Sequence, residues 1–170
     1  YKVTGVQTCA LPIFGYAALT AAELVAAGIP ASVPDDRHAR VDAVVRRVPK
    51  ELTCAGDWSS FGVWACLDHL TGSRVQASNL GASSGQPDEA LHAALTALRA
   101  PGDTTLDVAA LPDQFLNLAI VAAHRTGCTR FVGGANLRIK ECDRIAVMAR
   151  ELTKLGVDVH ERPEIGRAHV

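Results

Sequence analysis

The sequence predicts an α/β fold built from small repeated units, and three observations carry this prediction. Helix-length apolar segments alternate with short stretches typical of strands along most of the chain. An aspartate and a Thr-Gly pair bracket the same kind of segment twice. Hydrophobic residues make up 48% of the chain and charged residues 21%, which provides enough apolar side chains for a folded core.

The internal repeat becomes visible when the segment from Asp57 is compared with the segment from Asp113. Each runs from its aspartate through an apolar helix to Thr-Gly and then into a strand-like stretch, and the two aspartates are 56 residues apart. Aspartate is a favoured N-cap, and glycine suits the position after a helix C-terminus. A second helix follows each segment, at residues 87–100 and 142–156. We therefore expect one α-β-α unit used twice.

The chain on either side of the repeat continues the same pattern. Residues 16–33 repeat the ending of helix, glycine and strand, and a turn at residues 34–36 separates them from a further strand at 41–48. Residues 157–160 alternate between apolar and polar side chains, as a half-buried strand does.

Both ends of the chain look foreign to the protein. Residues 3–13 resemble the translation of a common short-read sequencing adapter, and residues 164–170 resemble its reverse complement read in another frame. We therefore expect residues 1–13 and 164–170 to be adapter-derived, and we exclude them from the fold prediction. The remaining sequence is then expected to be an internal piece of a longer protein.

Composition excludes several classes of function. A formal net charge of −1 argues against binding of nucleic acid or anionic membranes through bulk charge, and no apolar run is long enough to cross a bilayer. The cysteines and histidines show no zinc-site spacing, so no metal is expected. Phosphate-binding and dinucleotide-binding glycine motifs are also missing, and no cofactor is expected. The cysteines show no pattern of a disulfide framework, so a reduced, cytoplasmic setting is expected.

The charged run at residues 136–144 raises the main functional question. If the chain is helical from Lys140 onward, Lys140 and Arg144 lie four residues apart on one face. Like charges at this spacing repel each other by about 0.2–0.5 kcal/mol. An anion between the two cations would remove this cost, while a solvated helix start neutralised by Glu141 and Asp143 is the alternative.

The same run resembles the N-x-R-x-K-E-x-D-R signature of the 5-enolpyruvylshikimate-3-phosphate synthase family. Leu111-Pro112-Asp113 is similar to the I-P-D motif of this family, and the 23 residues from Asp113 to Asn136 agree with its spacing. Shorter similarities are G-D-x-S-S at residues 56–60, Q-G-D at 86–88 and Y-x-x-x-T at 16–20. The resemblance covers residues 14–163.

The resemblance implies an inside-out α/β barrel architecture, incomplete in this chain. In this family, two similar domains built from repeated units close over the substrates. Residues 14–53 would then be the C-terminal tail of the first domain, and residues 54–163 the front part of the second. The parent protein is expected to be a monomer.

The resemblance also implies a reaction, in which the enolpyruvyl group of phosphoenolpyruvate is transferred to the 5-hydroxyl of shikimate 3-phosphate. Asp113 would accept the hydroxyl proton, and Glu141 would exchange a proton with the methylene carbon of phosphoenolpyruvate. The substrate-binding residues implied by the resemblance are Asn136, Lys140, Arg144 and Tyr16.

Each of these residues also has a purely structural interpretation. Asp113 could cap a helix as Asp57 does, and Glu141 could pair with neighbouring cations. Asn136 could be a turn residue, and Tyr16 could be a core aromatic. Two alternative functions stay open: transfer of enolpyruvate to UDP-N-acetylglucosamine, and a non-catalytic α/β binding module.

This chain by itself is predicted to be inactive, because several anion-binding residues of the family fall outside it. The position of the family's shikimate-site serine coincides with Ile13, inside the adapter-like segment. The measurement is phosphate release from added shikimate 3-phosphate and phosphoenolpyruvate. Release above background by the purified chain would contradict the prediction.

Overall fold

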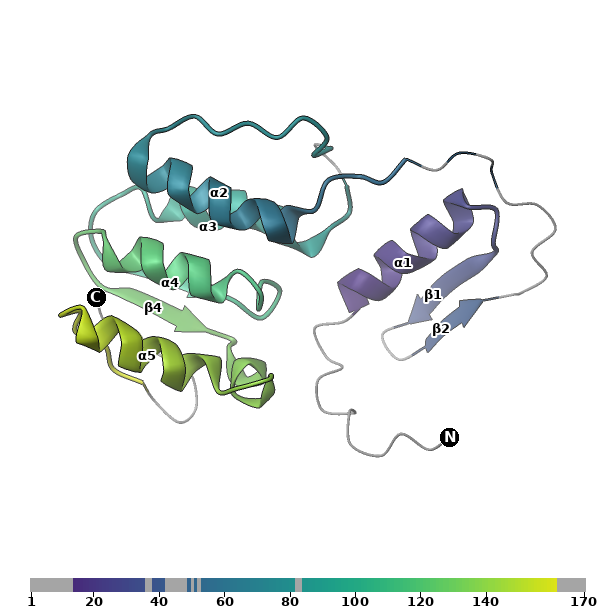
Figure 1. Ribbon diagram of the computed structural model, residues 1–170. Helices are drawn as coiled ribbons and strands as arrows, with labels where there is room; N and C mark the ends of the chain where they lie inside the picture. The colour runs from purple at the N-terminus through teal and green to yellow at the C-terminus, as the bar shows by residue number, and fades with distance from the viewer. Residues whose placement is uncertain are drawn as a thin grey trace. The chain divides into compact units, whose positions relative to one another are not determined.

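The computed structural model describes residues 14–35, 38–41, 49, 51, 53–81 and 84–161. These residues form a mixed α/β architecture, as predicted, with helices and two small sheets in the described part of the chain (Figure 1). The chain divides into two compact units. One comprises Tyr1–Gly56 and Asn79–Pro87, and the other comprises Asp57–Ser78 and Asp88–Val170.

The first unit contains a helix and a β-hairpin. Helix α1 (Phe14–Ala26) packs on strands β1 (Ala31–Asp35) and β2 (His38–Val41), which pair antiparallel. The predicted helix and first strand are therefore confirmed. The predicted turn lies slightly too early, since β1 extends through Asp35 and pairs there with His38. The second strand begins before its predicted start, and residues 42–48 lie outside the described residues.

The second unit carries the repeat. Its elements, in chain order, are α2 (Trp58–Thr71), η3 (Pro87–Ala90), α3 (Leu91–Ala97), β3 (Thr104–Asp107), α4 (Phe115–Ala123), β4 (Thr129–Val132), η4 (Ala135–Ile139) and α5 (Arg144–Lys154). Strands β3 and β4 pair in parallel, and α4 contacts both α2 and α5 (Figure 1). The equivalent helices of the two repeats, α2 and α4, thus pack against each other.

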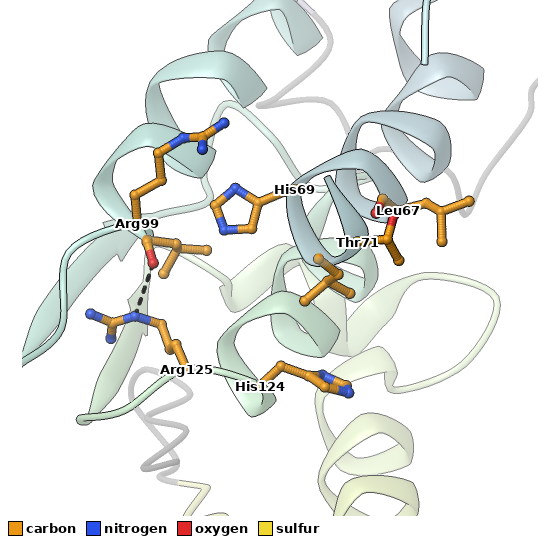
Figure 2. A pocket seen from close by; sticks show the side chains of 8 residues that line it. Leu67, His69, Thr71, Arg99, His124 and Arg125 are labelled. Carbon is orange, nitrogen blue, oxygen red and sulfur yellow. Dashed lines mark hydrogen bonds between the residues drawn. The ribbon is translucent and has the colours of Figure 1, made fainter. Parts of the chain in front are cut away.

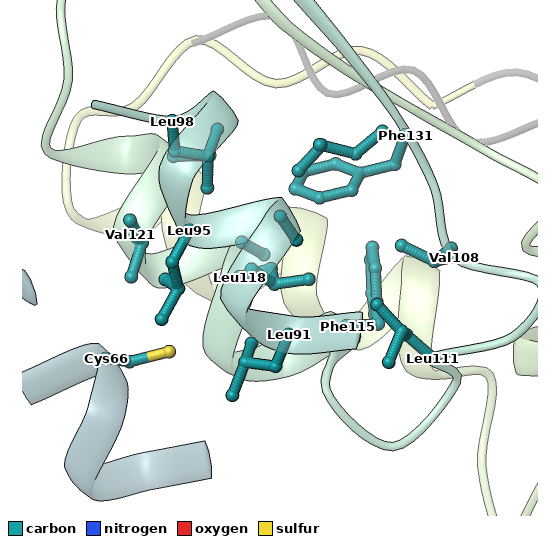
Figure 3. Packing of buried hydrophobic residues seen from close by; sticks show 14 of the residues in the cluster. Cys66, Leu91, Leu95, Leu98, Val108, Leu111, Phe115, Leu118, Val121 and Phe131 are labelled. Carbon is teal, nitrogen blue, oxygen red and sulfur yellow. The ribbon is translucent and has the colours of Figure 1, made fainter. Parts of the chain in front are cut away.

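A single apolar cluster holds the second unit together. Leu118 of α4 and Leu91 of α3 are fully buried, and Phe131 of β4 packs edge-to-face on Phe115 (Figure 3). Cys66 of α2 joins this cluster, as its apolar surroundings in the sequence predict. Burial raises the pKa of the Cys66 thiol to about 11, so this thiol is an inert core group.

The helix-end signals are confirmed for the first repeat. The Asp57 carboxylate accepts hydrogen bonds from the backbone N–H groups of Ser59 and Ser60 at the start of α2. Gly72 ends the helix in the left-handed conformation, with φ of 67°. The side-chain hydrogen bond from Ser60 and the backbone donors hold the pKa of Asp57 below its ordinary value, although burial opposes them.

In the second repeat, the helix-end prediction was wrong for Gly127. Helix α4 ends at Ala123, so this glycine is not its C-terminal cap. Gly127 has φ of 114°, and a Cβ there would collide with the Gly102 backbone. The glycine is therefore required by a close approach of two loops.

Two predicted strands do not form ladders among the described residues. After α2, Arg74 has φ of 55° and the Val75 N–H is bound by the Asp68 carboxylate, so the chain turns back on the helix end. After α5, the Val157 N–H bonds to the Leu152 carbonyl. Val157 and Val159 still pack against the core, so the alternation at 157–160 reflects burial without strand pairing.

No helix in the described ranges has both the length and the apolar character needed to cross a membrane.

Replacing Asp57 with alanine is expected to lower the free energy of unfolding by about 1 kcal/mol, because two backbone donors of α2 lose their acceptor. Asp57→Asn should lose much less, since asparagine caps equally well. Urea unfolding followed by circular dichroism measures both variants. Equal losses in the alanine and asparagine variants would contradict the capping role.

Candidate functional site

The candidate site lies on the segment that leads from β4 into α5. Gly133 follows β4 with φ of 74°, and a Cβ there would collide with the Asp107 carboxylate. The short helix η4 then carries Asn136, and α5 begins at Arg144 with Asp143 as its N-cap. Lys140 has an extended backbone, with φ of −75° and ψ of −158°. The helix considered from Lys140 onward therefore does not form, and Lys140 and Arg144 do not share a helix face.

The two cations nevertheless come together, around the carboxylate of Asp113. Arg144 Nη1 lies 2.8 Å from Asp113 Oδ1, and Lys140 Nζ lies 3.9 Å from the same oxygen. Arg144 is mostly buried, with 17% of its side chain exposed, while Asp113 is 40% exposed. The anion between the two cations in this structure is thus a side chain of the protein itself.

Asp113 does not cap α4 as its repeat position suggests. Gln114 occupies the N-cap position, and Asp113 precedes it. Gln114 is 1% exposed, and its amide nitrogen donates to the Ser59 carbonyl of α2, 3.2 Å away. Asn117 donates to its amide oxygen. Gln114 thereby fixes the start of α4 against α2 and leaves the Asp113 carboxylate directed at Arg144 and Lys140.

Glu141 completes the charge cluster from its exposed side. Its carboxylate accepts from Arg144 Nη2 at 3.0 Å, and 78% of its side chain is exposed. A hydrogen bond from its own backbone N–H, then Arg144 and more weakly Lys140, hold the pKa of Glu141 below its ordinary value. A lowered pKa keeps Glu141 ionised at neutral pH.

The other two predicted site residues have different surroundings. The Asn136 side-chain oxygen is buried and has no hydrogen-bond partner among the described residues. A buried acceptor in this state costs free energy until a donor reaches it. Tyr16 lies on α1 in the first unit, half-buried, and its carbonyl accepts from the Thr20 hydroxyl.

Sequence reasoning missed the contributions of Arg138, Asp143 and Gln114. Arg138 and Asp143 form an ion pair of 2.9 Å within the charged run. Both belong to the nine-residue signature, which indicates Asp143 only as a neutralising charge at a helix start and gives no partner for Arg138. Gln114 gave no signal, because a glutamine beside a helix start is ordinarily exposed. No cluster of three or more potential metal-ligating side chains occurs in the part of the chain that the structure describes.

A separate cavity of about 700 Å³ lies at the other end of α4 (Figure 2). Burial, and then the charge of Arg99, lower the pKa of His69 in this cavity. His124 contacts the Ile120 carbonyl through Nδ1, and Arg125 donates to the carbonyls of Leu98 and Gly102. The Ile120 and Leu98 carbonyls lie at the C-terminal ends of α4 and α3, where basic side chains commonly bind. The cavity is lined by Leu67, His69, Leu70, Thr71, Leu98, Arg99, His124 and Arg125.

The charge cluster lies in a part of the chain that matches a known protein family. Residues 102–169 match the model of the family described as EPSP synthase (3-phosphoshikimate 1-carboxyvinyltransferase). The 3-phosphoshikimate 1-carboxyvinyltransferase of Methanosphaerula palustris is 32% identical over 160 residues, which cover 85% of this chain and 38% of that protein. The matched residues, which include the charge cluster, are therefore similar to the EPSP synthase family.

Two further relatives with the same name show the same similarity. The Cellvibrio japonicus protein is 35% identical over 130 residues, covering 66% of this chain and 30% of the relative. The Clostridium perfringens protein is 47% identical over 58 residues, covering 34% of this chain and 14% of the relative. The chain thus spans at most 38% of the length of these three EPSP synthase relatives.

The charge cluster makes a prediction about proton binding. Replacing Arg144 with glutamine should raise the pKa of Glu141 toward its ordinary value, because a direct hydrogen bond and a neighbouring positive charge are both lost. Carbon-detected NMR titration of the Glu141 carboxyl measures the change.

Arg150→Gln is a matched control on the same helix. Lys154 and Arg150 hold the pKa of Glu151 low, so this variant should raise the pKa of Glu151 and leave that of Glu141 unchanged. An unchanged pKa of Glu141 in Arg144→Gln, with a normal response of Glu151 in the control, would rule out the proposed coupling.

Proposed function

We propose that this chain is part of a 3-phosphoshikimate 1-carboxyvinyltransferase. The full-length protein would transfer the enolpyruvyl group of phosphoenolpyruvate to the 5-hydroxyl of shikimate 3-phosphate and release phosphate, a step in aromatic amino-acid biosynthesis. The observation that supports this proposal most directly is that the Arg144 guanidinium and the Lys140 ammonium both lie close to one carboxylate oxygen of Asp113. Both substrates are anions, and the protein concentrates cations at this point.

Arg144 and Lys140 are proposed to bind the anionic groups of the substrates. A guanidinium presents two parallel donors to a carboxylate or phosphate, and Arg144 already uses two of its nitrogens on Asp113 and Glu141. An incoming anion would compete with these carboxylates for the same donors. The carboxylates therefore hold the cations in place before an anion binds.

Asp113 is proposed to accept the proton of the 5-hydroxyl as its oxygen attacks C2 of phosphoenolpyruvate. A carboxylate serves as a general base when it is ionised and lies within hydrogen-bond reach of the hydroxyl. Ion-pair contacts with Arg144 and Lys140 hold this carboxylate in place. Its 40% exposure leaves room for a hydroxyl to approach.

Glu141 is proposed to protonate C3 of phosphoenolpyruvate and to recover this proton when phosphate leaves. The carboxylate must therefore carry a proton for part of the cycle, whereas the surrounding cations hold its pKa low in this structure. Anionic groups bound to Arg144 and Lys140 would offset these charges and raise the pKa of Glu141. Binding of the substrates would thus favour the protonated form of Glu141, which the proposed step requires.

Asn136 and Tyr16 are proposed to contact shikimate 3-phosphate. The buried amide oxygen of Asn136 needs a donor, and a substrate hydroxyl would supply one. The full-length protein is further proposed to act as a cytoplasmic monomer on these small molecules.

The proposal is tested with the full-length protein, by phosphate release from phosphoenolpyruvate and shikimate 3-phosphate and by growth of a transferase-deficient bacterium without aromatic amino acids. Asp113→Asn is expected to lower kcat by about 10²–10⁴-fold, because the general base is lost. Asp57→Asn, at the equivalent repeat position, should keep full activity, because asparagine preserves the helix cap.

Several results would contradict the proposal. An Asp113→Asn variant as active as the wild type would exclude the proposed base. Turnover of UDP-N-acetylglucosamine in place of shikimate 3-phosphate would favour the sister enolpyruvyl transfer. Absence of both reactions in the folded full-length protein would leave the non-catalytic binding module.

A further inference from the structure

The signature run contains two charged residues, Arg138 and Asp143, to which the proposed reaction gives no role. They flank the turn that bears Lys140 and Glu141, and Arg144 follows directly. Arg138 Nη1 donates to Asp143 Oδ2 at 2.9 Å, across that turn. Their side chains are 26% and 35% exposed, so the pair is partly shielded from water.

The two oxygens of Asp143 serve different partners. Oδ2 accepts from Arg138 in η4, and Oδ1 accepts from the Ala146 N–H in the first turn of α5, at 3.0 Å. One carboxylate therefore joins the end of η4 to the start of α5. The intervening residues are closed into a loop by a charge-assisted hydrogen bond at one side and a helix cap at the other.

Arg138 extends this connection beyond α5. The same Nη1 lies 3.1 Å from Glu161 Oε2, in the segment that follows the helix. Arg138 thus contacts the chain on both sides of α5.

Core packing cannot supply the same constraint to the turn itself. Leu137 and Ile145 are buried and anchor the two sides. Between them, Ile139, Glu141 and Cys142 are exposed. Exposed side chains do not fix a backbone by packing, so polar contacts must do so, and the Arg138–Asp143 pair is the one that joins the two ends of the turn.

We propose that Arg138 and Asp143 are positioning residues, whose ion pair holds Lys140, Glu141 and Arg144 in the arrangement that receives phosphoenolpyruvate. This inference rests on the proposed transferase function. It differs from a capping role, because asparagine at position 143 would preserve the cap and abolish the charge.

The kinetic test uses the full-length protein with Asp143→Asn, Arg138→Gln and the double variant. Each single variant is expected to raise KM for phosphoenolpyruvate by about 10–100-fold, because small displacements of binding groups are costly. The KM for shikimate 3-phosphate should change less. The double variant should be no worse than Arg138→Gln alone, since that substitution already removes the ion pair together with the Glu161 contact.

Two control variants separate positioning from stability. Arg138→Lys keeps the charge and should restore part of the affinity for phosphoenolpyruvate. Arg150→Gln breaks an exposed pair on the same helix and should leave both KM values unchanged. Melting temperatures measured in parallel identify any variant that has lost its fold, and Asp143→Asn then decides the question because its cap is intact.

The outcomes also separate this inference from the proposed function. A folded wild-type protein without transferase activity would overturn the function and this inference with it. An active wild type whose Asp143→Asn and Arg138→Gln variants keep the wild-type KM for phosphoenolpyruvate would overturn the positioning role alone. Fully additive effects of the two substitutions would also overturn it.

Discussion

The candidate site depends on one interaction, the contact of Asp113 with Arg144 and Lys140. This contact joins the start of α4 to the start of α5, across 31 residues of sequence. Partly exposed ion pairs contribute only about 0–1 kcal/mol to stability, so the pair does not hold the unit together. The apolar cluster around Leu118 and Phe131 does that. The ion pair instead keeps two repelling cations side by side around one carboxylate.

The internal repeat shows how such a site can arise from a structural motif. Asp57 and Asp113 hold equivalent positions, yet only Asp57 caps its helix. In the second repeat the N-cap position is taken by the buried Gln114, which is anchored to α2. The carboxylate of Asp113 therefore does not cap α4, and it contacts Lys140 and Arg144, which lie far along the chain. The repeat thus places a carboxylate at a helix start, and one buried glutamine changes what that carboxylate does.

The elements that the sequence predicted well are those set by local chemistry. The helices of both repeats and the cap at Asp57 follow from side-chain spacing and from favoured cap residues. The predictions that failed are those of strands, which depend on pairing with a second strand elsewhere in the chain. Val75 and Val157 have strand-like neighbours, but their N–H groups bond to Asp68 and Leu152 and not to a neighbouring strand. Alternation reports which side chains are buried, and it cannot report whether a strand is available to pair.

Residue type and spacing alone were enough to recognise the family signature, the repeat and the charged residues. Long-range packing was needed to show that Lys140 is extended, that Asp113 fills the space between two cations, and that Arg138 and Asp143 close the turn. Local and tertiary interactions act between residues at different separations along the chain. Helix propensity and capping act over a few residues, whereas a charge responds to every neighbour that folding brings within a few ångströms.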